Sequence, residues 1–233
     1  MIELSTSRMK PGVVTVFILL LVLIVPKAHG QEQDFRTWWE VDISKDLTND
    51  LQASLDFSQR FRANSLQYDR SLVTAGLEYE LFKNFEIEAG YRFYVVRNDR
   101  MQLTTKYRIN GDVSYSVDLA AFEIQFRERV QYGFDDFSTI EVFADNKLTN
   151  RNKLTLEYDL FASPLTLFGS YELFTDISNI SSIEISDHRA ELGVEYALTF
   201  KSQLSLSYMF DTEVNTSNPL TAHVIVVGFG YDL

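Results

Sequence analysis

The chain has 233 residues, no cysteine, and 33 acidic residues against 21 basic ones, which gives a formal net charge of −12. Without cysteine it can have neither a disulfide framework nor a lipid anchor carried on a cysteine. The acidic balance disfavours nucleic acid as a partner, because phosphate binding needs clustered Lys and Arg. Two interpretations of the acidity stay open, attraction of cations and solubility alone.

The N-terminal stretch is typical of a secretory signal peptide. An apolar run over residues 13–25 follows Arg8 and Lys10 and ends in small residues, as cleaved export signals do. It is shorter than the roughly 20 residues that cross a bilayer as a helix. We therefore expect residues 1–30 to be removed and residues 31–233 to form one exported domain.

Alternating apolar and polar residues then run through the rest of the chain, which is the signature of transmembrane β-strands. In segment 85–96, apolar side chains share one face, and Glu86, Glu88 and Arg92 share the other. Strands are predicted near residues 35–43, 50–61, 71–81, 85–96, 105–119, 121–132, 152–161, 165–175, 188–199, 203–212 and 222–233.

The connections between these segments alternate in length. Short ones are predicted near residues 81–84, 119–121, 162–164 and 200–202, and long ones near residues 62–70, 97–104, 133–151, 176–187 and 213–221. Outer-membrane barrels have short periplasmic turns and long external loops. Pro164 and Pro219 both fall in connections, as expected where proline would interrupt a strand ladder.

A five-residue phrase with a central tyrosine between two apolar residues recurs five times, each time beside a short connection or at the C-terminus. We expect these tyrosines to form a periplasmic aromatic girdle, where a ring lies in lipid and its hydroxyl reaches the headgroups. The alternative is a soluble β-sandwich with tyrosines in its core. The girdle tyrosines are Tyr79, Tyr115, Tyr158, Tyr196 and Tyr231.

The expected fold is all-β: an antiparallel up-and-down transmembrane barrel of about 10–12 strands. Eleven segments alternate, whereas single-chain bacterial barrels have an even number of strands. Segment 35–43 should run toward the short-turn side, yet only residues 31–34 precede it in the mature chain. Ten strands with an irregular first segment and twelve with one unrecognised strand both remain open.

Several phrases resemble an uncharacterised family of Gram-negative outer-membrane proteins, catalogued as a domain of unknown function with a β-barrel fold. The resemblance extends over essentially the whole mature chain and implies the fold and the outer-membrane location. It brings no activity, substrate or site residues. The phrases are Thr37-Trp38, Gly76-Leu-Glu-Tyr79, Gly90-Tyr-Arg-Phe93, Arg127-Glu-Arg129 and Asn152-Lys-Leu with Glu157-Tyr158.

Charged side chains on the polar faces of the strands are the candidate functional residues. They either line a polar channel or ligand cavity, or cross-link a sealed barrel through ion pairs, as in small filled barrels. The candidate lumen-lining residues are Arg60, Glu78, Glu88, Arg92, Arg108, Asp112, Arg127, Arg129, Glu157, Glu191 and Glu195.

Catalytic chemistry has little support in the sequence. His188 and His223 lie near predicted external loops, and a histidine–serine pair there would suit a lipid-modifying hydrolase. Ordinary rim residues are the simpler interpretation. No phosphate-binding glycine loop, zinc-ligand spacing or nucleophile elbow occurs. We therefore expect no enzyme, no catalytic residue, no cofactor and no metal site.

The sequence thus predicts a porin-like outer-membrane protein with a structural role or a passive role in small-solute passage. The alternatives are a lipid-modifying hydrolase and a surface-binding protein acting through its long loops, chiefly residues 133–151. The expected partners are outer-membrane lipid, lipopolysaccharide and the barrel-assembly machinery that inserts such proteins. Nucleic acid is not expected, and a specific ligand is not identified.

Overall fold

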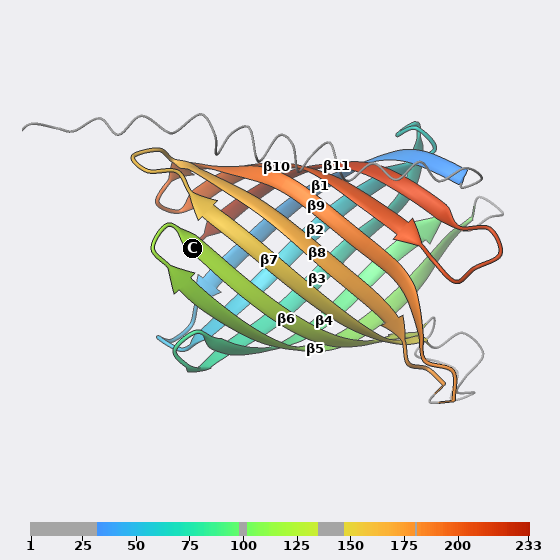
Figure 1. Ribbon diagram of the computed structural model, residues 1–233, viewed down its shortest axis with the longest axis horizontal. Helices are drawn as coiled ribbons and strands as arrows, with labels where there is room; N and C mark the ends of the chain where they lie inside the picture. Colours follow the sequence, from blue (N-terminus) through green and yellow to red (C-terminus); the bar gives the residue numbers. More distant parts are fainter. Residues whose placement is uncertain (1–31, 98–101, 135–146, 180) are drawn as a thin grey trace, which may run out of the picture. The chain divides into compact units, whose positions relative to one another are not determined.

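The structure of the protein, a computed structural model, describes residues 32–97, 102–134, 147–179 and 181–233, which form a closed β-barrel of eleven strands (Figure 1). The predicted signal peptide, residues 1–30, lies outside the described residues. No helix long and apolar enough to cross a membrane occurs in the described part of the chain. The strands are β1 (Glu32–Asp46), β2 (Leu51–Arg62), β3 (Gln67–Phe82), β4 (Phe85–Arg97), β5 (Leu103–Leu119), β6 (Phe122–Phe134), β7 (Lys147–Asp159), β8 (Leu165–Asp176), β9 (Glu184–Thr199), β10 (Ser202–Glu213) and β11 (Leu220–Asp232).

The barrel closes through one parallel strand pair. Consecutive strands pair antiparallel, but β1 and β11 run in the same direction, in register from Glu32 opposite Leu220 to Ser44 opposite Asp232. Eleven strands lie within the predicted range of about 10–12, which is confirmed, and they depart from the even number that is usual in single-chain bacterial barrels. All eleven alternating segments are strands, and parallel closure is what allows an odd number of them to form a ring.

The two ends of the barrel differ in their connections. One end, called here the short-turn end, has the connections 47–50, 83–84, 120–121, 160–164 and 200–201 and the C-terminus; the other, the long-loop end, has 63–66, 98–102, 135–146, 177–183 and 214–219 and the start of β1. Figure 1 shows the C-terminus at the left, which is the short-turn end.

The difference in connection length is smaller than predicted. The connection 63–66 is as short as 47–50, because β2 and β3 stay paired up to Arg62 opposite Gln67. The chain reverses there through left-handed backbone at Ala63 and its two successors. Both mature-chain prolines lie outside strands, as expected.

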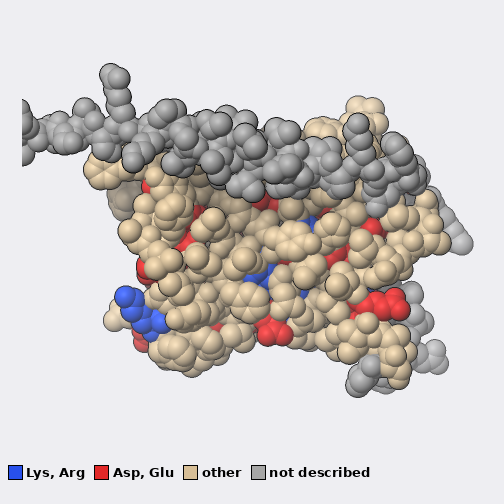
Figure 2. Space-filling model, viewed as in Figure 1, with Lys and Arg blue, Asp and Glu red and all other residues tan. Residues whose placement is uncertain are grey.

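The outward face of the barrel is apolar. Trp39, Phe57, Leu77 and Leu206 are exposed there, like many other large apolar residues along every strand, and the described surface in Figure 2 consists mainly of uncharged residues. A soluble monomer rarely exposes more than a few hundred Å² of contiguous apolar surface. The soluble β-sandwich is therefore wrong: the sheet closes on itself and has its apolar face outside, as a membrane barrel requires.

The inward face is mainly polar, and its one cluster of several buried apolar residues in the described chain lies along the closing seam. Trp38 of β1, Met209 of β10 and Ala222, Val224 and Val226 of β11 form a buried apolar cluster. Trp38 lies opposite Val226, and Met209 lies opposite Val224. Burial of these side chains stabilises the one strand pair that is farthest apart in sequence.

Interior glycines make room for larger neighbours, most clearly at Gly193 of β9. A Cβ at this position would overlap the ring of Phe168 and would lie 2.6 Å from Ser207 Cβ. We expect Gly193→Ala to lower the free energy of unfolding by about 1–3 kcal/mol, as overpacking does. Thermal unfolding in detergent would measure it. Gly111→Ala is the matched control, since a Cβ there meets nothing within 4 Å; equal loss in both variants would contradict this account.

Candidate functional site in the barrel lumen

Two cavities adjoin inside the barrel. The larger, about 620 Å³, lies in the long-loop half, and the smaller, about 350 Å³, extends toward the short-turn end. Pockets of 300–1,000 Å³ are typical of small-molecule sites. The two cavities share the lining residues Glu40, Arg60, Arg92, Arg127 and Arg129. Polar space therefore extends along much of the lumen.

The larger cavity is strongly cationic. Six carboxylates line it, from Glu40, Asp69, Glu172, Asp187, Glu191 and Asp211. Against them stand twelve of the 21 Lys and Arg residues of the chain. A chain that is acidic as a whole thus concentrates positive charge in one place. The cations are Arg36, Arg60, Arg70, Arg92, Lys106, Arg108, Arg127, Arg129, Lys147, Arg151, Lys153 and Arg189.

Glu172 of β8 connects three of these cations. It is 2% exposed and accepts two hydrogen bonds from Arg151, at 3.0 and 2.8 Å, and one from Arg127 at 2.9 Å. Arg189 lies 3.9 Å away and also donates to Asp211 at 2.9 Å. The contact with Arg127 spans from β8 to β6. This network holds arginines of three strands, β6, β7 and β9, at fixed places in the lumen.

Aromatic rings position other guanidinium groups. Trp38, 5% exposed, has Arg60 3.6 Å above its ring and Arg189 at 5.3 Å. Phe174 lies against Arg151 at 4.5 Å, among others. Stacking of this kind attracts the cation to the ring face and leaves the N–H groups in the guanidinium plane free for other partners.

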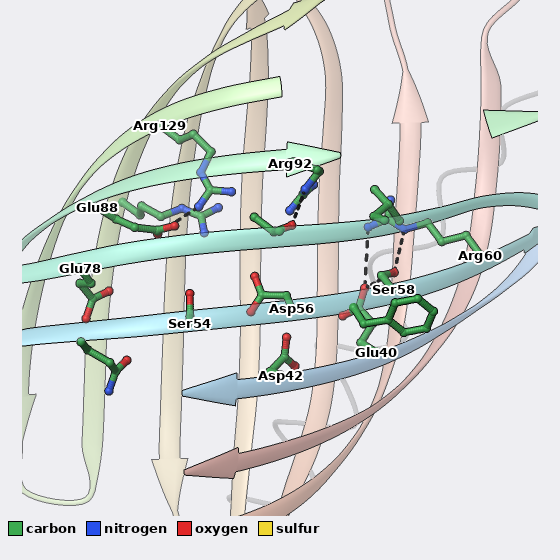
Figure 3. Close-up of a pocket in the computed structure, with 15 residues that line it drawn as sticks. Glu40, Asp42, Ser54, Asp56, Ser58, Arg60, Glu78, Glu88, Arg92 and Arg129 are labelled. Atoms are coloured by element: carbon green, nitrogen blue, oxygen red, sulfur yellow. Dashed lines mark hydrogen bonds and ion pairs between the residues drawn. The ribbon is translucent and has the colours of Figure 1, made fainter. Parts of the chain in front are cut away.

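The short-turn half of the lumen is acidic. Figure 3 shows Glu40, Asp42, Asp56 and Glu78 projecting into the smaller cavity from β1, β2 and β3. Further along, Glu86, Glu123, Glu157 and Glu195 lie within electrostatic range of carboxylate neighbours, as do Glu80 and Asp159. The three Lys residues near this end are not in the lumen: Lys45 is outward and Lys83 and Lys201 are in turns. Charge is therefore separated along the barrel axis.

The structure brings most of the candidate lumen residues together. Arg60, Arg92, Arg127 and Arg129 line both cavities, Glu78 and Glu88 the smaller one, and Arg108 and Glu191 the larger one. Asp112 is buried against Arg129. Glu157 and Glu195 line neither cavity and lie near the acidic short-turn end.

Several lining residues were missing from the predicted set. Arg151 lies on β7, which begins at Lys147, whereas the sequence indicated a loop up to residue 151. The alternation that placed Glu157 in the lumen extends back to Lys153 and Arg151, so this signal was present. Trp38 could have been recognised because Trp38 and Trp39 are adjacent in a strand, and only one of them can face outward.

The structure places the five predicted girdle tyrosines on the outward face near the short-turn end. Each lies on an odd-numbered strand that runs toward this end, and four are about two-fifths to one-half exposed. Tyr158 is half-buried, because its ring packs 4.6 Å from that of Phe122.

The two histidines also face outward. The Tyr208 hydroxyl and His223 Nδ1 are 2.6 Å apart, and the His188 ring lies 6.1 Å from that of Tyr171. Neither histidine makes a hydrogen bond with a serine within residues 32–97, 102–134, 147–179 and 181–233. No group of three or more His, Asp and Glu suited to a metal ion was found among the residues that the structure describes.

The fold and the lumen define a class of protein, the closed β-barrels with an apolar outer wall and a polar interior, which serve outer membranes as channels or structural components. Within this class, the chain belongs to the family described as Protein of unknown function (DUF2490), whose model matches residues 35–221. This confirms the resemblance to an uncharacterised barrel family.

Two solved structures that are similar to the chain are porins. No protein with a curated description matches the chain. Among solved structures it is similar to the NanC porin in a rhombohedral crystal form, with 12% identity and a TM-score of 0.49 over 76% of this chain and 86% of that one. It is also similar to a porin refined at 1.8 Å resolution, with 10% identity and a TM-score of 0.36 over 76% of this chain and 56% of that one. Both likenesses concern the barrel fold alone.

Proposed function

We propose that this protein is a passive channel for small solutes in the outer membrane, that it favours anions, and that its long-loop end faces outward. The observation that carries the proposal is the cavity of about 620 Å³ lined by twelve Lys and Arg side chains and six carboxylates. In a narrow space with low-dielectric walls, an excess of one charge concentrates mobile ions of the opposite charge.

Side chains that cross the lumen limit the size of what can pass. Arg129 of β6 reaches Glu88 of β4 at 3.3 Å, and Arg127 reaches Glu172 of β8. Arg189 of β9 reaches over Trp38 of β1. Because these contacts reach across the lumen from several directions, we expect only small solutes to pass.

The proposal includes the setting of the channel. The apolar outer wall suits outer-membrane lipid and lipopolysaccharide, and insertion would depend on the barrel-assembly machinery that serves proteins of this class. Catalysis is not part of the proposal, and neither the hydrolase nor the surface-binding role gains an observation in its favour. Of the loop that the surface-binding role depends on, predicted over residues 133–151, the two ends belong to β6 and β7, and residues 135–146 lie outside the described residues.

Reconstitution in a planar bilayer tests the proposal. We expect discrete conductance steps and, in a KCl gradient, a reversal potential whose sign indicates chloride preference. The preference should weaken as the salt concentration rises, because mobile ions screen the lining charges. Absence of conductance over a wide voltage range would overturn the channel, and a reversal potential of the opposite sign would overturn its anion preference.

A further inference from the structure

We propose that Arg92 and Arg108 together form a binding site for a small oxyanion with at least two negative charges, a dicarboxylate or a phosphate. The site rests on the proposed channel, since a solute reaches it only through the lumen. Both residues face inward and line the larger cavity, Arg92 from β4 and Arg108 from β5. Such a site would define the class of solute that the channel binds and the position in the lumen where the solute binds.

Two like charges lie side by side in this pair. Arg92 lies directly opposite Arg108 in the register of the two strands. Directly opposed residues have Cβ atoms about 4.5–5.5 Å apart, and like charges in this position destabilise a sheet. A divalent anion between the two guanidinium groups would remove this repulsion.

Neither arginine of the pair makes a direct ion pair with a carboxylate that the structure describes. Within the described residues, no carboxylate oxygen lies within 4.0 Å of a nitrogen of Arg92 or Arg108. Seven other arginines that line this cavity each have such a partner there: Arg36, Arg60, Arg70, Arg127, Arg129, Arg151 and Arg189. Among the arginines that line this cavity, only these two therefore lack a direct carboxylate partner in the described part of the chain, while Asp56 and Glu40 act on Arg92 from beyond ion-pair distance.

Neutral groups hold the two arginines in place. Arg92 Nε donates to Thr74 Oγ1 at 2.8 Å. Arg108 lies 5.6 Å from the centre of the Tyr94 ring and makes one long contact, 3.4 Å, with Gln131 Oε1. Its Nε is buried without a hydrogen-bond partner. Both side chains are therefore positioned while most of their donors stay available.

The chemistry of the donors selects the ligand class. Two planar guanidinium groups offer forked N–H pairs that match the oxygen atoms of carboxylate and phosphate. Chloride is spherical and has one charge, so it cannot bridge both forks in this way. A dicarboxylate and an inorganic phosphate share the required chemistry, and the experiment below separates them.

The test uses the full mature chain in detergent with Trp39→Phe, which leaves Trp38 of the cavity wall as the single tryptophan. Phosphate, succinate and chloride are titrated while Trp38 fluorescence is followed, with calorimetry as a second readout. We expect saturable binding of phosphate or succinate and no saturable binding of chloride in the same range. In Arg92→Gln/Arg108→Gln the affinity should fall roughly tenfold or more, because two charge-assisted donors are lost.

The matched control is Lys45→Gln/Lys83→Gln, which removes two positive charges from exposed positions outside both cavities. Its affinity should equal that of the parent, and heat-modified gel mobility would establish that all variants are folded. Equal weakening in both double variants, or saturable binding that survives Arg92→Gln/Arg108→Gln, would overturn the site. Binding without conductance would overturn the channel and keep the site, whereas anion-selective conductance without binding would do the reverse.

Discussion

A cysteine placed at Glu32 and one placed at Leu233 are expected to react with a membrane-impermeant maleimide from opposite sides of the membrane. The chain has no cysteine of its own, so each variant carries a single reporter. β1 begins at the long-loop end and β11 finishes at the short-turn end, because the two strands are parallel and eleven crossings separate their outer ends. In a barrel with an even number of strands, both termini would lie on one side.

Two further variants show which side of the membrane each end of the barrel faces. Ser217→Cys lies in the connection 214–219 and should label like Glu32→Cys, whereas Lys83→Cys lies in a short turn and should label like Leu233→Cys. If the long-loop end faces outward, Ser217→Cys and Glu32→Cys are labelled on intact cells. Lys83→Cys and Leu233→Cys are then labelled only after the outer membrane is permeabilised. Labelling of Glu32→Cys and Leu233→Cys from the same side would contradict the parallel closure.

Glu172→Gln is expected to destabilise the barrel more than any other single removal of a lumen charge. The carboxylate is 2% exposed and lies within 4 Å of three arginines, Arg127, Arg151 and Arg189. Removing one partner of a buried ion pair leaves uncompensated charge and costs about 3–5 kcal/mol. The change would be measured as a lower midpoint of thermal or urea unfolding in detergent.

Glu184→Gln is the matched control, since this residue is exposed at the start of β9 and the same substitution should leave the midpoint unchanged. A double variant tests whether the loss of stability comes from the ion pairs of Glu172. In an Arg151→Gln background, Glu172→Gln should cost less, because one of the three unpaired cations is gone, and coupled neighbours are not additive. A full-sized effect in both backgrounds would mean that Glu172 acts through something other than these ion pairs.

Much of the fold could be predicted from side-chain alternation. Segment 85–96 is typical: Glu86, Glu88 and Arg92 point inward on β4, as the pattern indicated. Alternation defines the two faces of a strand, but it says nothing about which strand closes the ring. The pairing of β1 with β11 joins residues almost 190 positions apart, such as Ser44 and Asp232, whose side chains are hydrogen-bonded. Alternation alone thus gave eleven segments, but their closure through a parallel strand pair had no local signal.

Individual lumen residues of the site could be predicted from the sequence, but their positions relative to one another could not. Arg92 and Arg108 were each expected in the lumen, and both are there. That they oppose each other, and that cations gather in one half of the barrel, depends on the stagger between neighbouring strands. A barrel fixes this stagger through the tilt of all its strands together. No single segment of sequence carries that information.

The axial separation of charge makes the lumen comparable to a semiconductor junction. Cationic side chains outnumber carboxylates in the long-loop half, and carboxylates predominate in the short-turn half. An applied voltage of one polarity drives mobile ions of both signs into the junction between the halves, and the opposite polarity empties it. The barrel should therefore rectify, carrying more current in one direction than in the other, and the sign of that asymmetry would report its orientation in the bilayer.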